Sequence, residues 1–163
     1  MALTELALGL PGQVFRCPMP FSAYDPQGRS LSEFRTRHVS AIVLLAEHQE
    51  CIQRAGRDLP HLYEEEGFEL IHVPVRDFDV PAPDALGPAV ERALAEARAG
   101  RNVAIHCHAG KGRTGLFAAC LAKAALGFSG DEAIAWIRRH IPGAVETAAQ
   151  EEFVRSYDGP GNA

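Results

Sequence analysis

Three short apolar runs alternate with helix-like segments along the chain, and this order restricts the possible folds more than any other feature. The runs are "AIVLLAE" at 41–47, "FELIHVPV" at 68–75 and "RNVAIH" at 101–106. Short runs that stay apolar on successive residues are typical of strands buried on both faces. Because helical patterns separate the runs, the sequence predicts an α/β fold with a central, mainly parallel sheet of about four to five strands flanked by helices.

The segments around these runs complete the expected order of elements. We expect an edge strand over 13–17, a short helix over 30–34, broken helical structure over 47–67 and further helices over 114–126, 130–140 and 147–157. Asp84 is expected to be the N-cap of a helix that ends near Ala99, with Pro88 in its first turn. The segment "RDFDVPAP" at 76–83 cannot continue a strand, because two prolines interrupt it.

Bulk properties exclude several classes of protein. With 163 residues, 47% hydrophobic and 23% charged, the chain has the composition of a globular protein, so we expect one domain over 1–163 with loose termini at about 1–13 and 158–163. A net charge of −5 argues against nucleic-acid binding, and no apolar stretch is long enough to be inserted in a membrane. The start lacks a basic leader, and four cysteines without close pairing indicate a reducing compartment, so we expect a cytoplasmic protein. We also expect it to be a monomer.

The segment "HCHAGKGRTG" at 106–115 directly follows the third run, where the loops of a parallel sheet bind ligands. A dinucleotide site would need an acidic residue on a second strand about 20 positions later, but Asp131 and Glu132 open a helix. A Walker loop would need serine or threonine at Gly112. A metal site fits poorly, because His106, Cys107 and His108 are adjacent and adjacent side chains of an extended segment point to opposite faces.

A turn that binds an anion explains why the segment at 106–115 combines glycines, a cysteine and an arginine. Gly110 and Gly112 permit the backbone to point successive N–H groups inward, and the positive end of the following helix faces the same point. Arg113 can hold two oxygens of one phosphate, which a lysine cannot do. The same positive field favours the thiolate of Cys107. The segment therefore predicts a nucleophile inside an oxyanion-binding loop.

The segment resembles the signature loop of the cysteine-dependent protein tyrosine and dual-specificity phosphatases, His-Cys-x-x-Gly-x-x-Arg-Ser/Thr-Gly. Every defined position of that signature matches: His106, Cys107, Gly110, Arg113, Thr114 and Gly115. The position of the loop in the chain excludes the low-molecular-weight branch, which carries it at the N-terminus. Rhodanese-type sulfurtransferases usually have fewer residues before the arginine and lack "RTG". The resemblance is to the compact dual-specificity branch.

This resemblance implies a phosphomonoesterase that needs no metal and no other cofactor, with Cys107 as the nucleophile. The phosphate would be bound by residues of the loop, namely His108, Ala109, Gly110, Lys111, Gly112 and Arg113. Thr114 would donate a hydrogen bond to the departing sulfur, and His106 would order the loop. A glutamine late in that branch positions the hydrolytic water, and Gln150 corresponds to it.

The leaving group needs a proton, and three aspartates follow the second apolar run. They are Asp77, Asp79 and Asp84. Asp77 aligns best with the acid of the compact branch, Asp79 is second, and Asp84 is expected to cap its helix.

The substrate class stays open at this point. We expect a phosphorylated protein, with phosphotyrosine first and phosphoserine or phosphothreonine second, or a small phosphomonoester. The stretch "CHAGKGR" differs at one residue from "CKAGKGR" of the phosphatase-and-tensin-homologue lipid phosphatases, so a phosphoinositide or inositol phosphate is the alternative. The chain has no polybasic segment for membrane docking. A phosphate-binding module without turnover is the third possibility.

Overall fold

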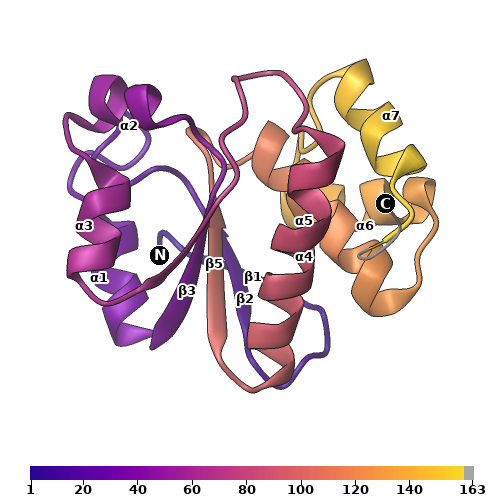
Figure 1. The fold of residues 1–163 in the computed structure, drawn as a ribbon, viewed down its shortest axis with the longest axis horizontal. Coiled ribbons are helices and arrows are strands. Elements are labelled where there is room, and N and C mark those ends of the chain that lie inside the picture. Colours follow the sequence, from indigo (N-terminus) through magenta and orange to yellow (C-terminus); the bar gives the residue numbers. More distant parts are fainter. Residues whose placement is uncertain (160–163) are drawn as a thin grey trace.

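The apolar runs form the centre of a five-stranded sheet in the computed structural model, which describes residues 1–159 (Figure 1). The strands are β1 (Thr4–Leu6), β2 (Val14–Cys17), β3 (Val39–Leu44), β4 (Glu69–His72) and β5 (Asn102–His106). Their order is β1-β2-β5-β3-β4; β2 to β5 run parallel, and β1 pairs antiparallel with β2. The predicted α/β class with a mainly parallel sheet is confirmed.

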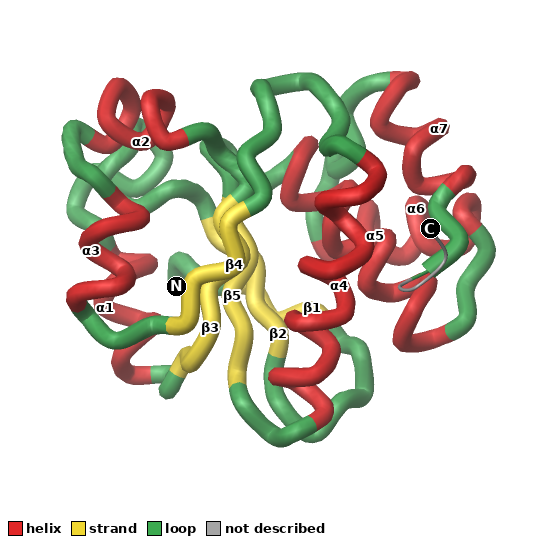
Figure 2. Tube along the Cα trace, viewed as in Figure 1, coloured by secondary structure: helices red, strands yellow, loops and turns green. Residues whose placement is uncertain are grey.

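Helices cover both faces of the sheet (Figure 2). They are α1 (Arg29–Thr36), α2 (His48–Ala55), α3 (Leu59–Glu65), α4 (Pro83–Arg98), α5 (Gly112–Leu126), α6 (Gly130–His140) and α7 (Ala148–Ser156). The first three helices lie on one face and the last four on the other. No helix among residues 1–159 has the length and apolar character needed to cross a bilayer.

Successive side chains of the central strands enter two different cores. Val43 and Ile105 pack with α4 to α7, whereas Ile42 and Ala104 pack with α1 to α3. All four side chains are fully buried. A strand with helices on both faces needs an apolar residue at every position, which explains why these segments read as continuous apolar runs.

The expectation of a loose segment over residues 1–13 is wrong. Leu3, Leu6 and Leu8 are buried, and β1 pairs with β2, so "QVFRC" is an internal strand and not an edge strand. The backbone amides of Ala2 and Leu3 also donate to the Glu33 carboxylate at 2.8 and 2.9 Å. Burial of leucine side chains at about 1.5–3 kcal/mol each offsets the cost of ordering this segment. At the other end, residues 160–163 lie outside the described part of the chain.

The start of α4 also differs from expectation. The helix begins at Pro83 with Ala82 as its N-cap, and Asp84 lies in the first turn without a capping hydrogen bond. Proline suits this first position because the missing N–H has no acceptor there. Pro88 therefore lies inside the helix, not in its first turn. The expected bounds of α6 are confirmed, and Ser129 begins that helix with a capping box.

Candidate active site

The loop after β5 turns its carbonyl groups outward, because donors from β2 and the segment after it bind them. The Arg16 guanidinium donates to the carbonyls of Ala109 and Gly110, and the Met19 amide donates to the His108 carbonyl at 2.8 Å. The N–H and C=O of one peptide point in opposite directions, so the amides that follow these carbonyls face into the turn. The loop has the geometry of an anion cradle.

Glycine is required within this loop for two separate reasons. Gly110 has φ +79°, and a Cβ there would lie 2.5 Å from the Cys17 carbonyl oxygen. A Cβ on Gly112 would lie 2.5 Å from the Glu146 carboxylate and 3.2 Å from Gln150. The first glycine allows the left-handed turn, and the second allows close approach of the segment that precedes and begins α7.

Cys107 lies buried at the base of the turn, at the carboxyl end of β5. The Thr114 hydroxyl, in the first turn of α5, donates to the Cys107 sulfur at 3.1 Å. The N-terminus of α5 is next to the same sulfur, so its positive end stabilises a negative charge there. The Cys107 sulfur, the N-terminus of α5 and the anion cradle therefore lie together.

Arg113 is held in a fixed orientation by an ion pair that sequence analysis did not find. Its side chain is only 2% exposed, and Nη1 and Nη2 each donate to a Glu50 oxygen at 2.8 Å. Nη1 also donates to the Val75 carbonyl, whereas Nε has no hydrogen-bond partner among the described residues. Burial alone would lower the pKa of Arg113, but Glu50 and Cys107 together raise it, so the guanidinium stays charged.

Glu50 is kept ionised by the same contact. Burial alone would raise the pKa of this carboxyl group, but the Arg113 guanidinium outweighs burial and holds the pKa below its ordinary value. Glu50 lies in the first turn of α2, shortly after the carboxyl end of β3. That position was the only available signal, because functional side chains of parallel sheets gather at the carboxyl ends of the strands.

The structure separates the three candidate aspartates. An Asp77 carboxylate oxygen lies 3.2 Å from Arg113 Nη2. Asp79 is exposed and turned to its own loop, since its carboxylate accepts from the Val80 amide. Asp84 is exposed on α4. Only Asp77 joins the cluster that contains Arg113.

Gln150 is completely buried and ties three segments together. Its side-chain NH₂ donates to the Asp79 carbonyl at 3.1 Å, and its oxygen accepts from the Glu146 and Thr147 amides. It also lies against Gly112, as the short distance to a Cβ at that glycine shows. The residue thus links α7, the loop that carries Asp77 and the catalytic loop.

His106 is buried below the loop and has structural partners on both ring nitrogens. Nε2 lies 2.8 Å from the Tyr63 hydroxyl, and Nδ1 lies 2.9 Å from the Cys107 carbonyl oxygen. Burial lowers the pKa of His106 to about 4, so the ring is neutral at pH 7. Tyr63 is a second residue that sequence analysis missed, because it comes from α3, far away in the chain.

The neutral state of His106 predicts a pH dependence of stability. Between about pH 6.5 and about pH 4 the unfolded chain binds a proton that folded His106 excludes, so the wild type loses up to about 3 kcal/mol as the pH falls. The His106→Gln variant lacks this contribution. Urea unfolding of the wild type and of His106→Gln at several pH values measures this contribution. Equal slopes for wild type and His106→Gln would contradict the assignment.

Two further groups of the loop lie at its rim. Lys111 is exposed, and the His108 ring packs edge-on against Tyr24 with centroids 4.9 Å apart. Burial is the main factor that lowers the pKa of His108. Possible metal-ligand atoms of Glu50, Asp77 and His108 lie within 4.8 Å of one another. Both carboxylates already pair with the Arg113 guanidinium, which takes the position of a cation in this cluster.

Comparison with known proteins decides the family. A family model described as "Tc-R-P: Polymorphic toxin system, DSP-PTPase phosphatase" matches residues 20–125, which is more than half of the chain and includes both Asp77 and the loop at 106–115. The chain belongs to this phosphatase family. The resemblance drawn from the loop is thereby confirmed.

Curated relatives of this chain are named as proteins that contain a phosphatase domain. "Protein tyrosine phosphatase domain-containing protein 1" of Bos taurus is 30% identical over 135 residues, which are 78% of this chain and 17% of that protein. The Mus musculus protein of the same name is 28% identical, over 85% of this chain and 19% of that protein. The chain thus spans less than a fifth of the length of these curated relatives.

Solved structures agree with the fold. Tk-PTP in its active form has a TM-score of 0.76 and 31% identity, and the match covers 93% of this chain and 94% of that one. Kinase associated phosphatase, solved with serine in place of its catalytic cysteine, has a TM-score of 0.84 and 22% identity, over 93% and 90% of the two chains. The second likeness concerns the fold alone.

Proposed function

We propose that this phosphatase hydrolyses phosphomonoesters in two steps through a phosphocysteine intermediate, without a metal or another cofactor. The observation that carries the proposal is the convergence of three groups on the cradle. Thr114 donates to the Cys107 sulfur, the buried Arg113 Nε–H has no hydrogen-bond partner within residues 1–159, and Asp77 contacts the Arg113 guanidinium. Splitting one difficult displacement into two easier ones is the usual advantage of a covalent intermediate.

In the first step the Cys107 thiolate attacks phosphorus, and the bond from phosphorus to the ester oxygen breaks. Asp77 gives its proton to that oxygen, and the loop amides of residues 108–113 together with Arg113 hold the other phosphate oxygens. In the second step Asp77 takes a proton from water while the water oxygen attacks phosphorus. The sulfur–phosphorus bond breaks, and the Thr114 hydroxyl stabilises the thiolate that leaves. In this mechanism His106 holds the loop in place, and Gln150 helps to position the water molecule that attacks in the second step.

We infer that phosphotyrosine in a protein is the preferred substrate, with phosphoserine and phosphothreonine second. Two large aromatic side chains are exposed beside the cluster. Tyr24, which contacts His108, is 58% exposed, and Phe78, which follows Asp77, is 60% exposed. An aromatic ring on the substrate can pack against such side chains, whereas a serine ester offers no ring.

An inositol phosphate is the alternative substrate, because exposed Lys111 adds a positive charge at the rim of the loop. One structural neighbour, PTPMT1, was solved in complex with PI(5)P, and another is described as a PP-IP phosphatase. Both likenesses are below 25% identity and concern the fold. We also keep a single domain, a monomeric state and a cytoplasmic setting as predictions.

A panel of substrates tests the proposal. Phosphate release is measured from a phosphotyrosine peptide, the matching phosphoserine peptide and a soluble phosphatidylinositol phosphate, with and without a chelator and with vanadate. We expect the phosphotyrosine peptide to have the highest kcat/KM, vanadate to inhibit, and the chelator to have no effect. A higher kcat/KM for the inositol lipid favours the alternative. Tight binding of phosphopeptide without release would show a binding module.

A further inference from the structure

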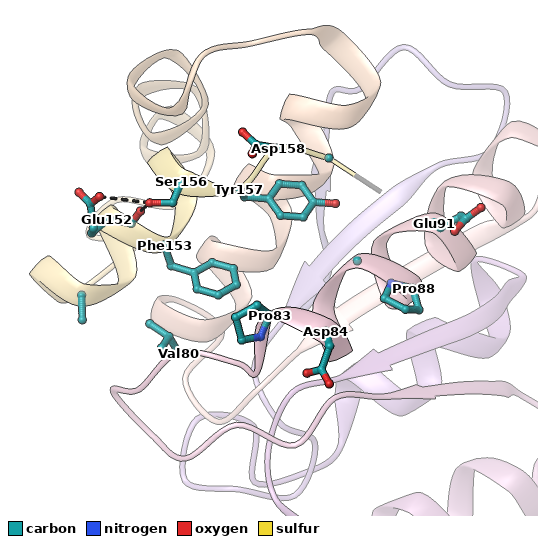
Figure 3. Close-up of a pocket in the computed structure, with 13 residues that line it drawn as sticks. Val80, Pro83, Asp84, Pro88, Glu91, Glu152, Phe153, Ser156, Tyr157 and Asp158 are labelled. Atoms are coloured by element: carbon teal, nitrogen blue, oxygen red, sulfur yellow. Dashed lines mark hydrogen bonds between the residues drawn. The ribbon is translucent and has the colours of Figure 1, made fainter. Parts of the chain in front are cut away.

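A groove of about 710 Å³ lies between α4 and α7, outside the cluster that contains Cys107 (Figure 3). Val80, Pro83 and Pro88 form its apolar side along the loop and α4, and Phe153 and Tyr157 face them from α7 and the residue after it. Ligand-binding clefts typically have volumes of about 300–1,000 Å³ and a mainly apolar lining, and this groove has both properties.

Charge around this groove is of one sign. The charged residues that line it within the described part of the chain are all acidic, namely Asp84, Glu91, Glu152 and Asp158. The N-terminus of α4 also reaches the groove, and its partial positive charge is offset by Asp84 in the first turn. An occupant that presents cations beside apolar side chains complements this surface, whereas acidic peptides, nucleic acids and anionic lipids are repelled.

The α7 wall of the groove is held in place from both ends. Lys123 of α5 donates from Nζ to the carbonyls of Val154 and Arg155 at 2.8 and 3.3 Å. At the other end, Gln150 donates to the Asp79 carbonyl. Because this wall is already ordered, the protein loses less conformational entropy when an occupant binds in the groove.

The groove is also close to the acid loop. Val80 lines it and is three residues from Asp77, a distance of at most about 11 Å along an extended chain. A peptide whose phosphorylated residue enters the Cys107 loop can therefore place residues a few positions away in the groove.

We propose that the groove between α4 and α7 binds an apolar segment carrying lysine or arginine in the phosphoprotein substrate. This inference rests on the proposed function, since it gives the substrate a second contact besides the phosphate. The apolar side chains would cover Phe153 and Val80, and the cations would face Glu91 and Glu152. The groove thereby selects among phosphoproteins by the residues that flank the phosphorylated one.

A binding experiment tests the groove without using catalysis. A fluorescent, unphosphorylated peptide in which leucine alternates with lysine is titrated with the protein at low and high salt, and a peptide with glutamate for lysine serves as comparison. We expect the lysine peptide to bind, and the Glu91→Lys/Glu152→Lys variant to bind it about tenfold more weakly, since two attractions become repulsions. The control variant Glu5→Lys/Glu64→Lys changes net charge equally on exposed residues outside the groove and should bind as the wild type does.

Turnover gives the second readout. The same two segments are attached to a phosphotyrosine, and we expect a lower KM for the lysine form, a difference that Glu91→Lys/Glu152→Lys removes while hydrolysis of p-nitrophenyl phosphate stays unchanged. Peptide binding without any turnover would support the groove as a binding site and overturn the proposed function. Turnover with equal KM values for the two peptides, together with no peptide binding, would overturn the proposed role of the groove and leave the proposed phosphatase function supported. A dimer that the same double variant dissociates would assign the groove to a second copy and overturn the proposal.

Discussion

Replacing Cys107 by serine is expected to reduce phosphate release from p-nitrophenyl phosphate on the order of 10⁴- to 10⁶-fold. A serine hydroxyl is a far weaker nucleophile than a thiolate, and the positive end of α5 cannot ionise it at neutral pH. The loop amides and Arg113 are unchanged in this variant, so binding of tungstate should remain close to that of the wild type. Steady-state kinetics and calorimetric titration with tungstate measure the two quantities.

A buried cysteine outside the loop provides the control for this substitution. Cys120 lies in the core on α5, and Cys120→Ala should keep the catalytic rate. Burial raises the pKa values of Cys17 and Cys51 to about 12, so neither thiol can replace the nucleophile at neutral pH. Native rates in the Cys107→Ser protein would exclude the phosphocysteine intermediate, and loss of tungstate binding would show that the cradle depends on the sulfur.

The second large effect on the catalytic rate is expected when Asp77 is replaced by asparagine. We expect kcat for a phosphotyrosine peptide to fall by about 10²- to 10⁴-fold, because the tyrosine oxygen leaves without a proton. For p-nitrophenyl phosphate the decrease in kcat should be less than about tenfold, since 4-nitrophenolate leaves readily as an anion. The asparagine oxygen can still accept from the Phe78 amide, as the Asp77 carboxylate does at 3.0 Å.

Asp79→Asn is the matched control, two residues away on the same loop. Its side chain is exposed and accepts from the Val80 amide of its own loop, so both substrates should be hydrolysed at wild-type rates. Equal losses on both substrates in Asp77→Asn would place the acid elsewhere. A loss specific to the peptide in Asp79→Asn would move the assignment to that residue.

The sequence predicts the sheet and the loop well, because their signals are local. The run at 101–106 and the loop after it are contiguous, and Gly110 has the positive φ that a tight anion-binding turn requires. The room that Gly112 leaves for Glu146 and Gln150 depends on the tertiary structure. The N-terminal strand was missed because Leu3, Leu6 and Leu8 are separated residues in a segment that starts with no strong pattern. The expected N-cap of α4, Asp84, lies two residues after the observed N-cap, Ala82, since both Pro83 and Asp84 are suitable for a helix N-terminus.

What the sequence alone determined is the chemistry of one turn: Cys107, the glycines and Arg113 are adjacent, so a single stretch of chain specifies the nucleophile and the cradle. Only the tertiary structure decided which distant groups meet that turn. Glu50 follows β3, Asp77 lies beyond β4 and Arg16 is the penultimate residue of β2, and the sheet brings all three to the same edge as Cys107. Partners that come from different strands have no spacing in common, because parallel strands align their carboxyl ends in space and not in the sequence.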